Sequence, residues 1–254
     1  MLLAGKKGLV LNVVNKNSIG WGIAEAATQH GALVGVGGQN PEMLARVNKL
    51  IEGNASYVPF MVDFTSDEQI AALVEDVAEK FGKIDFLVHA AAFAKRDDLA
   101  GRFIDTSRDG FAMAMDISAF SLVAICRAFE PLLNEDASIM TLSYLGSQRA
   151  AVGYNMMGIA KAALESTVRY LASDLGDRGI RVNTLSPGPI NTVAARGVRD
   201  LSGKISHAHA MAPLKRDFGI DEVGGNAVYL MSDLSKGVTG QLIYVDSGYN
   251  ISTP

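Results

Sequence analysis

Tyr154 and Lys161 lie seven residues apart at the start of a helical pattern, soon after a strand pattern that ends near Tyr144. Seven residues make roughly two helical turns, so both side chains project from one helix face, about 10 Å apart along the axis. Beside a nucleotide such a pair can support hydride transfer, because the lysine can hold a ribose and lower the phenol's pKa while the tyrosine polarises a substrate oxygen. The same spacing also arises by chance on amphipathic helices, so the surrounding elements must decide.

Short β-rich runs alternate with helical patterns along the whole chain, which is typical of crossover βαβ units. We expect strands at residues 8–14, 32–36, 57–62, 86–89, 138–143, 181–185 and 242–245. We expect helices at residues 20–30, 42–51, 67–80, 108–132, 154–175 and 221–231. This order predicts an α/β fold, a single Rossmann-type doubly wound parallel seven-stranded sheet with helices on both faces. Its ligand site should lie at the carboxyl ends of the strands.

The composition is that of a globular protein, with 48% hydrophobic and 20% charged residues. No linker divides the 254 residues, so we expect a single domain, 1–254. A net charge of −4 without a basic cluster argues against a nucleic-acid partner. The N-terminus lacks the order of a signal peptide, and no run of 18 apolar residues could span a membrane. We therefore expect a cytoplasmic protein without membrane insertion.

Cysteine and histidine give no metal site in this sequence. Cys126 is the single cysteine, which excludes an internal disulfide, and its apolar neighbours indicate a small buried hydrophobe. His89, His207 and His209 have no carboxylate at ligand spacing, and the last two are two residues apart, off one helix face. We expect no bound metal.

The first strand-to-helix turn, residues 12–22, has small residues where a phosphate-binding turn needs them, although it lacks G-x-G-x-x-G. Ser18 can offer a hydroxyl, and Gly20 and Gly22 can let the backbone approach a pyrophosphate at the helix N-terminus. The alternative is a plain glycine turn. Its place after the first strand favours dinucleotide binding.

Residues at the ends of the second and third strands could contact the adenosine half of such a dinucleotide. The second strand is followed by Gln39 and has neither an acid for a ribose hydroxyl nor a cation for a 2′-phosphate, so NADH is favoured over NADPH. Arg46 is the nearest cation in the sequence. After the third strand, Asp63 and Phe64 could hold an adenine, although Asp63 could equally cap the approach to the next helix.

With these positions in view, the chain resembles the short-chain dehydrogenase/reductase superfamily and, within it, the bacterial NADH-dependent enoyl-acyl-carrier-protein reductases. Most specific are residues 142–146 followed by 154–161, because ordinary superfamily members carry Tyr-x-x-x-Lys whereas the enoyl reductases have six residues between Tyr and Lys. Other matching stretches are residues 17–19, 39–40, 116–118, 181–183, 188–192 and 245–248. The resemblance covers nearly the whole chain.

The resemblance implies a role for each matching residue. Tyr154 would hydrogen-bond the thioester carbonyl of a trans-2-enoyl substrate and stabilise the enolate formed when hydride reaches the β-carbon. Lys161 would hold the nicotinamide ribose, and Tyr144 would line the acyl pocket. The cofactor would be NADH, with these further contacts: Asn12, Ser18, Ile19, Gln39, Asp63, Phe64, Ala90, Ala92, Ile190 and Thr192.

The chain departs from the family pattern close to the expected cofactor. Asn12 stands where the family usually has glycine, and residues 90–92, all alanine, stand where it usually has Ser-Ile-Gly. Asparagine tolerates left-handed backbone, but its side chain takes space that glycine would leave open.

The resemblance also implies a substrate-binding lid near residues 191–212, helical over 194–211, an acyl-carrier-protein-bound substrate and a homotetramer. In the lid, Ser202 and Gly203 replace residues that are often basic in relatives. Two alternatives remain: a short-chain reductase that acts on a ketone or another conjugated carbonyl outside fatty-acid synthesis, and a regulatory nucleotide-binding protein without turnover. The intact Tyr154 and Lys161 argue against the second.

Overall fold

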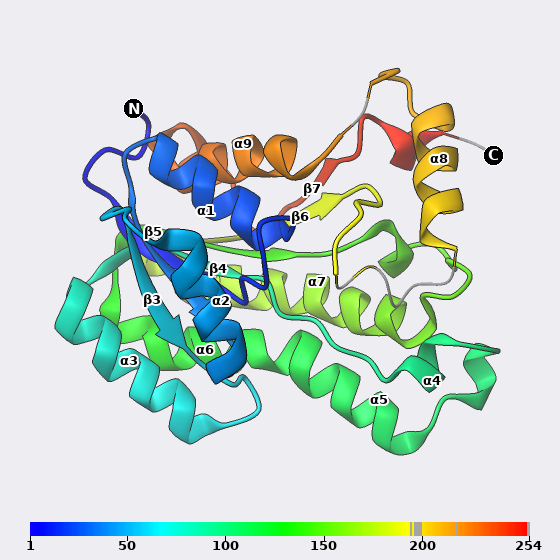
Figure 1. The fold of residues 1–254 in the computed structure, drawn as a ribbon, viewed down its shortest axis with the longest axis horizontal. Helices are drawn as coiled ribbons and strands as arrows, with labels where there is room; N and C mark the ends of the chain where they lie inside the picture. The colour runs from blue at the N-terminus through cyan, green and yellow to red at the C-terminus, as the bar shows by residue number, and fades with distance from the viewer. Residues whose placement is uncertain (194, 196–199, 217, 253–254) are drawn as a thin grey trace.

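Seven parallel strands form one sheet in the order β3-β2-β1-β4-β5-β6-β7 (Figure 1). The structure is a computed structural model that describes residues 1–193, 195, 200–216 and 218–252. The strands are β1 Lys7–Leu11, β2 Leu33–Gly38, β3 Tyr57–Met61, β4 Ile84–His89, β5 Leu133–Leu142, β6 Arg181–Pro187 and β7 Leu242–Val245. The strand order reverses between β1 and β4, which confirms the predicted doubly wound α/β fold.

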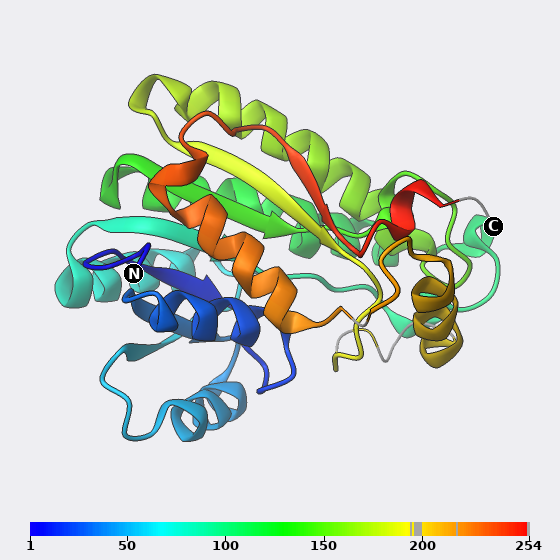
Figure 2. The ribbon, with the colours of Figure 1, turned by 90° about the horizontal axis from the view of Figure 1, so that it is seen from above.

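Helices cover both faces of the sheet (Figures 1 and 2). The helices are α1 Ile19–Gln29, α2 Pro41–Ile51, α3 Asp67–Phe81, α4 Arg96–Leu99, α5 Arg108–Met115, α6 Ser121–Phe129, α7 Asn155–Leu175, α8 Leu201–Met211 and α9 Ile220–Met231. Each face of the sheet has its own hydrophobic core, and alternate strand residues belong to different cores. Leu9 and Leu11 pack with α3, α6 and α7, whereas Val10 packs with α1, α2 and α9. The period-2 geometry of a strand thus builds both cores from one buried run.

Local capping explains where several helices begin. The side chains of Ser18, Asn40, Ser66 and Ser107 each accept a hydrogen bond from a backbone N–H in the first turn of the helix that follows. Pro41 adds a fixed φ at the first turn of α2. These short side chains satisfy N–H groups that the helix itself leaves unpaired.

The expected single helix at 108–132 is interrupted by a π-helical turn, Asp116–Phe120, between α5 and α6. By length and composition alone, Arg108–Leu132 would qualify as a membrane span, because an 18-residue window within it has a mean hydropathy of 1.6, so the expectation that no run could span a membrane was wrong. Leu122, Ile125 and Phe129 are nevertheless fully buried against the sheet. We therefore interpret this stretch as a core helix of the fold.

Gly22 lies where α1 and α9 pack closely together, which explains the absence of a side chain at this position differently from the sequence analysis. A Cβ at Gly22 would lie 2.7 Å from Cβ of Ile220, and one at Gly224 would lie 2.7 Å from the carbonyl oxygen of Gly22. The missing side chain therefore makes room for a neighbouring helix rather than for a pyrophosphate. Of the two glycines, Gly20 lines the cleft described below.

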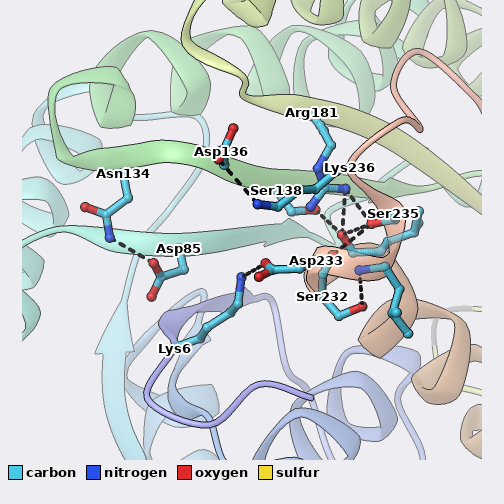
Figure 3. A network of polar contacts seen from close by, with 12 residues as sticks. Lys6, Asp85, Asn134, Asp136, Ser138, Arg181, Ser232, Asp233, Ser235 and Lys236 are labelled. Atoms are coloured by element: carbon cyan, nitrogen blue, oxygen red, sulfur yellow. Dashed lines mark hydrogen bonds and ion pairs between the residues drawn. The ribbon is translucent and has the colours of Figure 1, made fainter.

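A polar network ties the amino ends of the strands to the end of α9 (Figure 3). The buried Arg181 donates through Nη1 to the carbonyl oxygen of Leu230 at 2.8 Å and to Oγ of Ser235 at 2.7 Å. Ser138 of β5 donates to the same carbonyl at 2.8 Å. Since a ligand site at the carboxyl edge lies at the other end of the strands, we assign this network to stability.

We expect Arg181→Ala to lower the free energy of unfolding by about 1 to 3 kcal/mol, because it leaves the buried Ser235 hydroxyl and Leu230 carbonyl short of a donor. The matched control is Lys236→Ala, which removes a surface ion pair with Asp136 and should cost below about 1 kcal/mol. Chemical denaturation measures both. Equal, small effects would contradict the structural role of Arg181.

Candidate functional site

A cleft of about 450 Å³ opens at the carboxyl ends of β1, β4, β5 and β6. Most of the predicted site residues line it: Asn12, Ser18, Ile19, Ala90, Ala92, Tyr144, Tyr154, Lys161, Ile190 and Thr192. Because parallel strands end at one edge, residues from four separate loops meet there. The tertiary structure thus brings together groups that are up to 180 residues apart in the sequence.

The tyrosine and the lysine both face this cleft from α7. Tyr154 is the N-cap residue of the helix, and Lys161 lies two turns further along, only 5% exposed. The ammonium Nζ donates a hydrogen bond to the carbonyl oxygen of Leu142, the last residue of β5, at 2.6 Å. One contact leaves donor capacity on this ammonium for a ligand in the cleft.

Burial shifts the pKa values of these two groups in opposite directions. It lowers the pKa of Lys161 to about 8, against the smaller opposing effect of the Glu165 carboxylate. It raises the pKa of Tyr154, with smaller contributions in the same direction from Tyr144 and Glu165. The expected lowering of the phenol's pKa by Lys161 is therefore wrong, and Tyr154 stays a protonated hydrogen-bond donor at neutral pH.

Two glycines let the Tyr154 ring stand where it does. A Cβ at Gly146 would lie 2.5 Å from the Tyr154 ring, and a Cβ at Gly158 would lie 2.6 Å from the carbonyl oxygen of Gly146. The Tyr144 ring meets the Tyr154 ring edge-on, with centroids 4.9 Å apart. The phenol is thus fixed between an aromatic edge and a backbone turn.

Asn12 adopts the left-handed conformation that its place in the turn demands, with φ of 70°. Its side-chain amide donates to the carbonyl oxygen of Ala90 at 3.0 Å, so it bridges the ends of β1 and β4. The side chain therefore joins two strand ends across the switch point instead of pointing freely into the cleft. Asparagine here accepts the backbone geometry of glycine and adds a cross-strand contact.

The N-terminus of α1 presents backbone to the cleft at Ser18, Ile19 and Gly20. The Ser18 hydroxyl is already engaged, since it donates to the carbonyl oxygen of Asn15 at 2.7 Å and accepts from the Trp21 N–H at 3.2 Å. It acts as a helix cap. Anion binding at this point would fall to the helix N-terminal backbone and its dipole.

Gln39, Asp63 and Phe64 are the predicted site residues that do not line the cleft. The Asp63 carboxylate accepts hydrogen bonds from the N–H and the hydroxyl of Thr65, at 2.9 and 2.8 Å, which matches the local role considered as the alternative. Phe64 is buried and packs edge-on against His89. Their adenosine contacts stay predictions.

A polar set under the cleft was not assigned a role from the sequence. The fully buried His89 pairs through Nδ1 with the Thr141 hydroxyl at 3.1 Å and through Nε2 with the Ser121 hydroxyl at 2.8 Å. Burial, followed by the Lys161 charge, lowers its pKa to about 3, so His89 is neutral and cannot act as an acid at neutral pH. Ser118, in the π-helical turn, contacts both the N–H and the carbonyl of Phe93. The interrupted helix thus holds the segment that follows β4. In the sequence, the only signal for this role was that residues 116–118 match the family.

The expected lid is described only in part, because residues 194 and 196–199 lie outside the described residues. Its helical portion is α8, from which Leu201 and Lys204 line the cleft. Lys204 donates to the carbonyl oxygen of Val152 at 2.8 Å, two residues before Tyr154. Within the described part of the chain, no His, Cys, Asp and Glu cluster could hold a metal ion.

Comparison with known proteins gives one consistent result. The family model of the enoyl-(acyl carrier protein) reductases matches residues 13–250. The chain belongs to this family. An NADH enoyl-acyl-carrier-protein reductase of Rhizobium meliloti is 47% identical over 98% of this chain and 92% of its own length.

Solved structures of family members agree with the fold throughout. The NADH enoyl-acyl-carrier-protein reductase of Aquifex aeolicus is 40% identical with a TM-score of 0.96, and the match covers 100% of both chains. The Bacillus cereus enoyl-acyl-carrier-protein reductase, solved with NADP⁺ and indole naphthyridinone, is 45% identical with a TM-score of 0.96. That match covers 100% of this chain and 99% of the other.

The residues of this reductase fit a nicotinamide dinucleotide. The α1 N-terminus offers unpaired backbone N–H groups for a pyrophosphate. The buried Lys161 ammonium, with a single backbone partner among the described residues, suits a ribose diol. Ile190 and Thr192, after β6, line the same cleft on its far side.

We expect NADH to bind more weakly as the pH rises above about 8, because the Lys161 ammonium is present below its pKa of about 8 and is lost above it. Fluorescence titration with NADH from about pH 6.5 to about pH 9.5 measures this. Lys161→Arg is the control, since a guanidinium with a pKa above about 12 stays charged throughout. Wild-type affinity that is constant to pH 9.5 would contradict the assignment.

Proposed function

We propose that the protein reduces the double bond of trans-2-enoyl thioesters on acyl carrier protein, in fatty-acid synthesis, with Tyr154 and Lys161 at its catalytic centre. The observation that carries this assignment is the pair itself, two turns apart on α7 and facing one cleft with Tyr144. The family membership supports the reaction, and the names of the relatives support NADH as the reductant. Bound NADH supplies the hydride.

The chain's own residues position the substrate and stabilise its developing charge. The Tyr154 hydroxyl donates a hydrogen bond to the thioester carbonyl oxygen, which becomes an enolate oxygen as hydride reaches the β-carbon. Because burial keeps the phenol protonated, the donor is in place before the reaction begins. Lys161 holds the nicotinamide ribose, and Tyr144 lines the acyl pocket.

The spacing of the pair favours attack at the β-carbon. A spacer of six residues instead of three moves the phenol about 4.5 Å further from the lysine along the helix. The attacked carbon of an enoyl thioester lies two bonds from the carbonyl carbon, whereas in a ketone the carbonyl carbon is itself attacked. The longer spacing therefore suits a donor that must reach further along the substrate.

NADH preference is supported by the neutral end of β2. Gln39 and Asn40 carry no charge, and Arg46 is held by Glu42 at 2.6 Å in an exposed pair on α2. The nearest cation in the sequence thus already has a carboxylate partner. Gln39, Asp63 and Phe64 would contact the adenosine half at the ends of β2 and β3.

We further propose a single cytoplasmic domain over residues 1–254, with residues 191–212 as its lid, that assembles as a homotetramer. One continuous sheet supports the single domain, and Leu201 and Lys204 at the cleft support the lid. Phe111, Met113 and Phe120 are exposed along α5 and the π-helical turn, which supports a subunit contact there.

Tyr154→Phe should lower kcat by about 100- to 1,000-fold and leave NADH affinity nearly unchanged, because it removes one oxyanion donor. Lys161→Ala should also weaken NADH binding, since it removes the ribose contact. Steady-state kinetics and fluorescence titration separate the two effects. Wild-type turnover by Tyr154→Phe, with chemistry rate-limiting, would refute the role of the phenol.

With deuterated NADH, we expect the label at C3 of the saturated thioester and little or no alcohol from simple ketones. A trans-2-enoyl thioester and a panel of ketones, analysed by mass spectrometry, give the comparison. Tyr144→Phe should be milder than Tyr154→Phe, because Tyr144 lines the pocket without carrying the negative charge. Turnover of ketones without activity on any enoyl thioester would instead establish the carbonyl-reductase alternative.

A further inference from the structure

Glu165 is a buried carboxylate beside the catalytic pair. It lies on α7, one turn after Lys161, and is 9% exposed. Its Oε1 accepts hydrogen bonds from Oγ of Ser143 and Oγ of Ser147, both at 2.5 Å. Burying a carboxylate is costly unless donors replace water, and these two short contacts provide that replacement.

The two serines flank Tyr144. Ser143 directly follows β5 and is anchored by its backbone N–H to the carbonyl oxygen of Leu185 at 2.8 Å. Ser147 ends the 3-10 turn Leu145–Ser147. The single carboxylate oxygen therefore closes the loop 143–147 at both ends and fixes its position relative to α7.

The position of this loop determines where the catalytic phenol can stand. Gly146, inside the loop, passes so close to the Tyr154 ring that even a methyl group there would clash. Tyr144, also in the loop, meets the Tyr154 ring edge-on, with ring centroids 4.9 Å apart. A shift of the loop by a fraction of an ångström would thus move or release Tyr154.

The same helix turn also holds the end of β5. Lys161 binds the carbonyl oxygen of Leu142, and Glu165 binds the hydroxyl of the next residue, Ser143. The negative charge of Glu165 moreover opposes the effect of burial on the Lys161 ammonium. Glu165 therefore affects both the position of the end of β5 and the charge of Lys161.

Resting on the reductase activity and on the roles of Tyr154 and Lys161 proposed above, we propose that Glu165 is a positioning residue. Its carboxylate holds the loop 143–147 against Tyr154 and supplies the counter-charge for the Lys161 ammonium. Glu165 touches neither substrate nor reacting atoms and acts through these two groups.

Several ionisable groups share this environment and bear on any pH test. They come from α7, its N-cap, the loop 143–147, β4 and β7, and are Lys161, Arg169, Tyr154, Tyr144, His89 and Tyr244. The tyrosines have pKa values raised by burial, and His89 is neutral above its pKa of about 3. Lys161 is therefore the group in this set that titrates near pH 8.

Two variants separate charge from position. Glu165→Gln removes the charge and keeps the size, so kcat should fall about ten- to a hundredfold, and the loss of NADH affinity at alkaline pH should begin at a lower pH than in the wild type. Glu165→Asp keeps the charge on a shorter side chain, so kcat should fall. The pH at which NADH affinity is lost should shift less than in Glu165→Gln. Glu79→Gln, exposed on α3, is the control and should behave as wild type.

The measurements are kcat and KM with an enoyl thioester, NADH affinity against pH, and thermal unfolding. A folded Glu165→Gln with wild-type kcat and an unshifted pH dependence would overturn the proposal, as would a lower melting temperature with unchanged kcat per folded protein. If Glu165→Gln does not fold, Ser147→Ala replaces it, since removing one donor should lower kcat severalfold; unchanged kcat would again refute the idea.

Failure of the proposed function is distinguishable from failure of this inference. If the wild type does not reduce enoyl thioesters, the proposed function fails, while NADH affinity against pH still tests whether Glu165 controls Lys161. If the wild type is active and the Glu165 variants have the same kcat and pH dependence as the wild type, the inference about Glu165 fails and the proposed function stands.

Discussion

The hydrogen bonds from α7 to the end of β5 are the interaction on which the site depends. Lys161 binds the Leu142 carbonyl, and Glu165 binds the two serines that flank Tyr144. These contacts place a helix-borne phenol and ammonium beside the loop that carries the second tyrosine. A site built in this way takes its precision from the helix and strand, and its buried polar groups are satisfied by backbone and hydroxyl partners.

The switch point between β1 and β4 supplies the other half of the cleft. Asn12 spans it by combining a left-handed backbone with a side-chain contact to Ala90. At the end of β4, His89 is fixed by Ser121 and Thr141, and the π-helical turn lets Ser118 hold Phe93. A π-helical turn in a long helix commonly marks a functional region, and here it secures Phe93, which follows β4 and lines the cleft.

Local geometry thus accommodates the departures from the usual family residues at the edge of the cleft. Asn12 keeps the backbone conformation for which glycine is normally chosen, and its amide is satisfied by a strand end. Ala90 and Ala92 line the cleft with methyl groups only, so they add no polar groups that would need partners. Tyr154 and Lys161 line the same cleft from α7.

The sequence by itself determined the fold class, the succession of strands and helices along the chain and the Tyr154–Lys161 pair, because hydrophobic period and residue spacing are local properties. It also marked Ser118 and Arg181 within matching stretches, without showing what they contact. Only the tertiary structure decided that Gly22 serves helix packing, that the Tyr154 pKa is raised, and that Glu165 joins Ser143 to Ser147. These outcomes depend on burial and on contacts between elements far apart in the chain, which no local pattern encodes.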